Sequence, residues 1–348
     1  MLRISLVVVF LFMSALMPSC ASRSKAGSEL KRSGDEIVVA GRLFHTGAPV
    51  VLWTDPGGYD AYRVERRFSP LEQSDWEHSK DKLESPNRYN LRRVALFDDQ
   101  WDIVRGGGWP LSLLQEHVDQ FVLHYDAAGA SRNCFRVLHD ERGLSVHFML
   151  DVDGTIYQTL DVKERAWHAT KSNDRSVGVE IAQIGAYPES KRATLDQWYV
   201  QETAGRTRKT RIVFPKWMGD GGVRTSNFVG YSARPEVIAG TVNGTQLLQY
   251  DFTKEQYESL AKLTATLSRI LPKIKLDVPR DEEGKVLDRV LTDEEWDRFS
   301  GVLGHCHVQA NKIDPGPAFD YEKLLRDARR FKGELTRKRR AVSGGRKR

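Results

Sequence analysis

The chain has 348 residues, of which 40% are hydrophobic and 29% are charged. This length suffices for one large domain or two ordinary ones, and the composition excludes both a bundle of membrane helices and a disordered chain. The net charge of +6 is concentrated in residues 329–348, which carry ten Lys or Arg and one Glu, so the remainder sums to −3. The folded part is therefore nearly neutral, and the basic character belongs to the C-terminal segment.

The N-terminus has the pattern of an export signal over residues 1–20. Arg3 supplies the positive start, residues 4–17 form an apolar run, and a small-residue region with Cys20 follows. The apolar run is shorter than the roughly 20 residues that span a bilayer, which favours a cleaved signal peptide. Cys20 after a small residue resembles the lipobox of bacterial lipoproteins and predicts a lipid anchor; the alternative is an ordinary secreted protein with an incidental Cys20. We expect an exported protein of the bacterial cell envelope, periplasmic or attached to the outer membrane.

The segment before residue 111 is predicted to contain a linker and an N-terminal extension. Residues 21–35 are polar and lack periodicity, which is typical of a flexible linker. The extension covers residues 36–110 and begins with short β-branched strands at 37–40 and 49–53. Residues 59–95 are charged with scattered aromatic side chains, and their pattern assigns them no function.

The main domain is predicted over residues 111–331 as an α/β fold, with a single mixed central β-sheet and helices packed on it. Apolar runs predict the strands, and the spacing of apolar residues predicts the helices. In chain order, we predict a helix at 111–118, a strand at 120–125, a helix at 131–139, strands at 145–150 and 155–160 joined by an Asp-Gly turn, and a strand at 176–181.

A β-rich insertion at about residues 185–250 interrupts this domain. Its predicted strands lie at 210–214 and 237–250, the second turned at Asn243-Gly244. The insertion is either a lid that contacts substrate or a passive elaboration. After it we predict helices at 254–271, from Thr292 to Gly304 and from Asp320 onwards, followed by a basic, disordered tail at 332–348.

The densest group of metal-binding and charged residues lies close to the end of the main domain, in the sequence GHCHVQANKIDPGP at 304–317. His305 and Asp314 could supply two ligands to a divalent metal, and His124, at the end of a predicted strand, could supply a third. Two imidazoles and a carboxylate would leave one zinc coordination position for a water molecule, whose pKa zinc lowers to about 7.

Two further residues could complete such a site. Glu180 is a carboxylate in an apolar strand and a candidate general base, and Lys312 could stabilise an oxyanion. Each has a structural alternative: Glu180 could be an edge residue or part of a salt bridge, and Lys312 could form a surface ion pair with a nearby Asp. Cys134 and Cys306 would remain after signal cleavage, as one disulfide or as buried thiols.

Six motifs occur in a family-specific order across roughly residues 117–328. They are FVLH at 121–124, SVHF at 145–148, DGTIYQ at 153–158, AWHA at 166–169, SVGVE at 176–180, and GH at 304–305 with KIDPGP at 312–317. In this order they resemble the type 2 N-acetylmuramoyl-L-alanine amidases, the superfamily of the phage-lysozyme amidases and peptidoglycan recognition proteins.

The resemblance implies a zinc ion held by His124, His305 and Asp314, with Glu180 as the base and Lys312 assisting. It implies hydrolysis of the amide between the lactyl group of N-acetylmuramic acid and L-alanine. The substrate would be peptidoglycan or its muropeptide fragments, in cell-wall degradation, remodelling or recycling. The alternative is a peptidoglycan-binding protein of the same superfamily without catalysis.

The resemblance also implies that Trp167 and His168 line the substrate groove, with packing beneath the site as the alternative for His168. His307 stands where a small acidic residue is common and could compete for the metal. Val146 stands where other branches carry a catalytic Tyr, which assigns the base role to Glu180. The basic tail lacks interleaved aromatic residues, so we expect no specific nucleic-acid partner and favour contact with anionic envelope polymers or lipids, or a solvated terminus.

Overall fold

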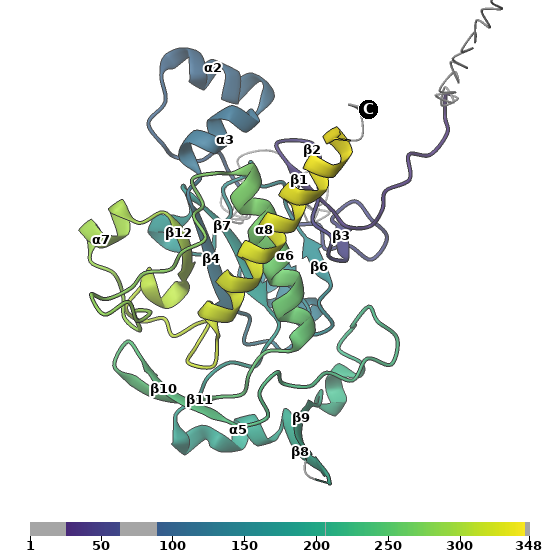
Figure 1. The fold of residues 1–348 in the computed structure, drawn as a ribbon, viewed down its shortest axis with the longest axis vertical. Helices are drawn as coiled ribbons and strands as arrows, with labels where there is room; N and C mark the ends of the chain where they lie inside the picture. The colour runs from purple at the N-terminus through teal and green to yellow at the C-terminus, as the bar shows by residue number, and fades with distance from the viewer. Residues whose placement is uncertain (1–25, 63–88, 206, 345–348) are drawn as a thin grey trace, which may run out of the picture. The chain divides into compact units, whose positions relative to one another are not determined.

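The computed structural model describes residues 26–62, 89–205 and 207–344 (Figure 1). The predicted signal peptide with Cys20 lies outside the described residues, as does most of the unassigned segment 59–95. By its internal contacts the chain divides into Met1–Ser33 and Gly34–Arg348, and every element below belongs to the second unit. In the described ranges, no helix has the length and apolarity needed to cross a bilayer.

A six-stranded mixed sheet forms the centre of the second unit, which confirms the predicted α/β class. Its strand order is β12-β4-β7-β5-β6-β3, and the first four strands are mutually parallel while β6 and β3 run the opposite way. The strands are β3 (Val50–Leu52), β4 (Gln120–Tyr125), β5 (Phe148–Leu150), β6 (Ile156–Gln158), β7 (Ser176–Ile181) and β12 (Gly301–Gly304).

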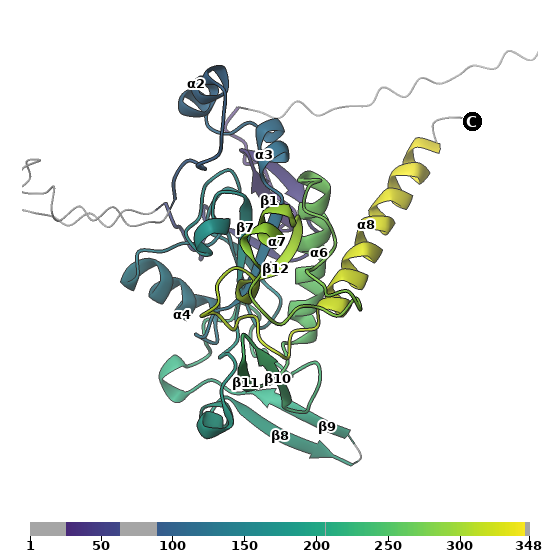
Figure 2. The ribbon, with the colours of Figure 1, turned by 90° about the vertical axis from the view of Figure 1, so that its left-hand side faces the viewer.

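Side chains that alternate along the strands create a core on each face of the sheet. Phe148, Leu150 and Ile156 face a core that includes α6 (Lys254–Ile270), whereas Met149 and Tyr157 face a second core. Helix α6 begins at a Thr253 capping box and lies beside α8 (Tyr321–Gly344) on one side of the sheet (Figures 1 and 2).

The opposite face is covered by α4 (Ser131–Phe135), which continues into a π-helical turn, η2 (Arg136–Glu141) (Figure 2). This pair corresponds to the helix predicted at 131–139. The remaining helices of the described residues are α2 (Asp98–Gly107), α3 (Leu111–His117), α5 (Arg192–Asp196) and α7 (Asp293–Arg298), with 3₁₀ turns η3 (Thr170–Ser172), η4 (Glu189–Lys191), η5 (Lys216–Met218) and η6 (His305–His307).

The N-terminal extension contributes to the sheet itself. After an antiparallel ribbon of β1 (Glu36–Val39) and β2 (Arg42–His45), the chain enters β3, which pairs in parallel with β6 at the sheet edge. Both predicted strands of this segment are present, although β2 was not predicted.

Residues between β7 and α6 form two antiparallel hairpins outside the central sheet. They are β8 (Tyr199–Ala204) with β9 (Thr207–Ile212), and β10 (Ile238–Val242) with β11 (Thr245–Gln249) (Figure 1). The turn predicted at Asn243-Gly244 joins β10 to β11, and both of its residues have the positive φ that such a turn requires.

One prediction near the C-terminus is wrong. The helix expected to run from Thr292 to Gly304 ends at Arg298, and Gly301 starts the edge strand β12 instead. Strand β12 pairs with β4, and this pairing places the apolar residues Val302 and Leu303 of β12 in the core. Gly301 allows the close approach of the neighbouring chain, because a Cβ there would lie 2.7 Å from the Asp277 carbonyl oxygen. Helix α8 runs as far as Gly344, into the segment predicted from the sequence as a basic tail from residue 332.

Candidate metal centre

Parallel strand ends bring the predicted site residues together. His124 is the register partner of Glu180 in the neighbouring strand, so the two side chains lie side by side on one face of the sheet. On the other side of β4, Gly304 at the end of β12 pairs with Leu123, so that His305 emerges next to His124. The carboxyl ends of parallel strands are the usual place for a binding site in such sheets.

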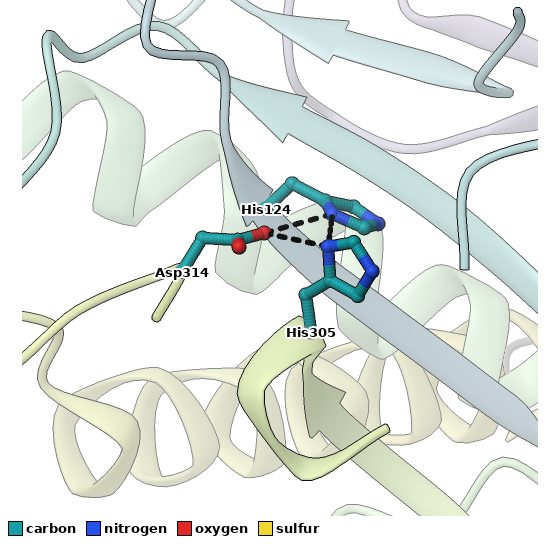
Figure 3. A group of neighbouring side chains, drawn as sticks. All are labelled: His124, His305 and Asp314. Atoms are coloured by element: carbon teal, nitrogen blue, oxygen red, sulfur yellow. Dashed lines mark hydrogen bonds and ion pairs between the residues drawn. The ribbon is translucent and has the colours of Figure 1, made fainter. Parts of the chain in front are cut away.

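Three ligand atoms converge at this place (Figure 3). Nδ1 of His124 lies 3.0 Å from Nδ1 of His305, and Oδ2 of Asp314 lies 2.9 Å and 3.1 Å from these two nitrogens. All three side chains are buried. Atoms that coordinate one zinc ion tetrahedrally at its usual bond lengths are about 3.3 Å apart, so the three residues fit a zinc site.

The two histidines also make hydrogen bonds through their outer ring nitrogens, Nε2. Nε2 of His305 donates to the Gln309 carbonyl oxygen over 2.6 Å. Nε2 of His124 lies 3.0 Å from Nδ1 of His168, whose Nε2 lies 3.2 Å from Oγ of Ser176. The tautomer with the proton on Nε2 of both His124 and His305 leaves both Nδ1 atoms unprotonated and facing Oδ2 of Asp314. In that tautomer the three buried atoms are all acceptors, an arrangement suited to binding a cation.

The charge states agree with this arrangement. Burial, assisted by the neighbouring His305, lowers the pKa of His124 to about 4. Burial alone would raise the pKa of Asp314, but His305 and His124 outweigh it and hold that pKa below its usual value. A neutral imidazole and an ionised carboxylate are the forms that bind a metal.

All seven predicted site residues line one cavity of about 290 Å³: His124, Trp167, His168, Glu180, His305, Lys312 and Asp314. Burial raises the pKa of Glu180 well above the usual value, with a further contribution from the charge of Asp314 and an opposing one from Lys312. A carboxylate with a raised pKa is suited to accept and return a proton near neutral pH.

Residues 114–211 match the model of the N-acetylmuramoyl-L-alanine amidase family, Amidase_2. The chain carries a domain of the type 2 N-acetylmuramoyl-L-alanine amidase superfamily. The match includes β4 and β7, with His124 and Glu180, and ends before the segment that supplies His305, Lys312 and Asp314. The family supports amidase activity on peptidoglycan. No match was found among curated proteins.

Solved structures with partial similarity include the following three. They are AmpD (15% identity, 70% of this chain and 94% of that chain, TM-score 0.33), E. coli AmiD in complex with anhydro-N-acetylmuramic acid-L-Ala-D-γ-Glu-L-Lys (16%, 64% and 59%, 0.34), and the endolysin amidase LysCS of Clostridium intestinale URNW (14%, 62% and 86%, 0.32). Similarities of this size carry no functional argument.

Neighbouring residues that could have competed for a metal have other partners. His307 accepts from the Gly304 N–H through Nδ1 and donates to the Leu287 carbonyl through Nε2, so both of its nitrogens are engaged. His147 likewise binds Gly178 N–H and the Glu164 carbonyl. Cys134 and Cys306 are both buried, and neither forms a disulfide.

Sequence reasoning missed the residues that orient the ligands. Gln309 lies four residues after His305, a spacing that reaches the same side of a helical turn and could have suggested the contact. Ser176 begins the strand that carries Glu180, and its contact with His168 depends on a loop whose path the sequence does not indicate.

Proposed function

We propose that the amidase domain is a zinc-dependent hydrolase that cleaves the amide between N-acetylmuramic acid and L-alanine in peptidoglycan or its fragments. The observation that carries this proposal is the convergence of three potential ligand atoms, from His124, His305 and Asp314, beside Glu180 in one cavity. Two of these ligands lie outside the segment matched by the family model, so their convergence is independent support.

In this proposal His124, His305 and Asp314 hold the zinc ion, which would polarise the scissile carbonyl and lower the pKa of a water molecule. Glu180 takes a proton from the water as its oxygen bonds to the carbonyl carbon. As the C–N bond breaks, the same carboxyl returns the proton to the departing amine of L-alanine. Lys312 offsets the negative charge that develops on the carbonyl oxygen.

The walls of the cavity would position the glycan and peptide. Trp167 lines it, with the guanidinium of Arg165 stacked on the indole at 4.3 Å from the ring centroid. Stacking fixes the indole plane as a flat apolar surface, which suits packing against a sugar ring. His168 also lines the cavity while it holds His124, so it serves the groove and the metal ligand together.

We further propose that the protein acts in the cell envelope after export. This follows from the signal-like sequence of residues 1–20, with attachment through a lipid on Cys20. The domain boundaries inferred from the sequence, 111–331 for the amidase domain with the insertion at about 185–250, remain part of this proposal.

The proposal is tested by digestion of purified peptidoglycan with residues 21–348, followed by mass spectrometry of the released stem peptides. We expect peptides that begin with L-alanine, loss of this release in a chelator, and recovery on addition of zinc. Glu180→Gln should bind zinc but release no peptide, whereas Glu258→Gln, which alters an exposed helix residue paired with Lys262, should behave as the wild type. Bound zinc without any release would instead favour a peptidoglycan-binding protein.

A further inference from the structure

The β10–β11 hairpin of the insertion contacts the metal-binding segment from outside the active-site cavity. Among the described residues that line this cavity, none comes from 185–250. The hairpin instead shares a small core with that segment, in which Val242 and Leu247 pack with Cys306 and Ile313. The insertion therefore supports the residues that carry His305 and Asp314, and its described part does not cover the site as a lid.

The tip of the hairpin places one carboxamide in the middle of this segment. Nδ2 of Asn243 donates to the carbonyl oxygens of Lys312 (2.7 Å) and Cys306 (3.0 Å), and a third, that of Gln309, lies at 3.4 Å. Oδ1 of Asn243 accepts from Val290 N–H over 2.7 Å. The chain between the two ligands thus folds around a single side-chain amide.

A second carboxamide at the other end of the hairpin binds the chain just after Asp314. Gln249 is fully buried, and its Nε2 donates to the Pro315 carbonyl (3.0 Å) while its Oε1 accepts from Ala318 N–H (2.9 Å). Gly316 leaves room for this side chain, because a Cβ there would lie 2.2 Å from Oε1. The two amides therefore fix the backbone on both sides of Asp314.

We propose that Asn243 and Gln249 are positioning residues that set the affinity of the metal site by holding the segment from His305 to Asp314 in its coordinating conformation. This rests on the proposed function, in which these residues bind zinc. Apart from the short turn η6, this segment has no regular structure of its own. Without Asn243 its inward carbonyls lose their donor, and the segment can relax away from His124.

Two substitutions of Asn243 separate the amide from the backbone that carries it. Asn243 has a φ of 45°, which Gly adopts freely, so Asn243→Gly removes the side chain without backbone strain. Asn243→Asp keeps the size of the side chain and the contact with Val290 N–H, but directs an anionic oxygen at the three carbonyls. Asn227→Gly is the matched control, because Asn227 is an exposed residue of the same insertion with a φ of 57°.

The experiment measures the zinc dissociation constant by competition with a chromophoric chelator, and the thermal midpoint of each protein with and without zinc. We expect a dissociation constant raised on the order of tenfold or more in both Asn243 variants. The increase in midpoint on zinc addition should shrink accordingly. The visible spectrum of the cobalt-substituted protein should change, whereas Asn227→Gly should match the wild type in every measurement.

Equal zinc affinity and equal cobalt spectra in the wild type and the folded Asn243 variants would overturn the proposal. So would an equal fall of the zinc-free and zinc-bound midpoints, because a purely structural role predicts that result. If Asn243→Asp does not fold, Asn243→Gly decides the question alone. Absence of zinc binding by the wild type would overturn the proposed function as well, which distinguishes that failure from one confined to Asn243.

Discussion

The His168 ring, which packs against β7, contacts the proposed metal ligand His124, and this support can be tested directly. Gly178 faces this ring, and a Cβ at Gly178 would lie 2.5 Å from both Cε1 and Nδ1 of His168, where ordinary contacts begin at 3.4 Å. In Gly178→Ala the ring must therefore move by about 1 Å. Because Nδ1 is the atom that contacts Nε2 of His124 at 3.0 Å, this movement breaks their hydrogen bond.

Two effects are expected from Gly178→Ala. Overpacking of a buried position lowers the free energy of unfolding by about 1–3 kcal/mol, measured by urea unfolding of the zinc-free protein. Loss of the hydrogen bond behind a ligand weakens metal affinity by roughly 10–100-fold, measured by chelator competition. Gly106→Ala is the control, because Gly106 lies in α2 and a methyl group there would have no atom within 4 Å, so stability should be unchanged or slightly higher.

A double-mutant cycle identifies the steric cause. His168→Ala removes the ring, so Gly178→Ala should cost little further stability in that background, and the two changes should be strongly non-additive. The same cost for Gly178→Ala with and without His168 would refute the proposed clash and the role assigned to this glycine.

Three further predictions concern buried polar groups. Arg92→Met should lower the free energy of unfolding by about 3 kcal/mol or more, because the fully buried guanidinium binds four backbone carbonyls. The control, Arg93→Met, alters the exposed neighbouring position and should lower this free energy far less. Urea unfolding measures both variants. Burial raises the pKa of Asp151 to about 7. Between about pH 4 and pH 7 this carboxyl therefore binds more protons in the folded protein than in the unfolded chain. The stability that it contributes is fully present below about pH 4 and is lost as the pH rises through 7. Asp151→Asn should flatten this dependence in midpoints recorded from pH 4 to 8. His305→Ala should abolish zinc binding, whereas His307→Ala should retain zinc and lose stability, because the partners of His307 are backbone groups; zinc content of the purified variants separates the two.

Elements with a strong local pattern were predicted closely. Strands β4 and β7 match their predicted bounds, because a continuous apolar run identifies a buried parallel strand. Helix α6 starts at Lys254, as predicted, and the Asn-Gly turn of β10–β11 fixes the register of that hairpin. In each of these elements the information lies within a window of a few residues.

Elements that depend on distant partners were not predicted. The four residues of β12 follow a well-capped helix, so local pattern favours a longer helix, and only pairing with β4 makes them a strand. The edge strand β3 was predicted as a strand, but its place beside β6 follows from contacts about one hundred residues apart in the sequence. The local preferences of the residues do not predict which strands pair with one another.

The candidate site divides in the same way. The candidate metal-binding residues were predicted from motifs, but the hydrogen bonds that orient them come from Gln309 and His168, whose contacts depend on the folded loops. Asn243 and Asn227 illustrate the limit most clearly, since both adopt a left-handed backbone and both belong to turns of the insertion. Asn227 is exposed, whereas Asn243 lies against the carbonyls of a segment more than sixty residues further along the chain. The preference of asparagine for turns predicts the backbone conformation at both positions. The groups that its side-chain amide binds depend on the segment that the fold places opposite the turn.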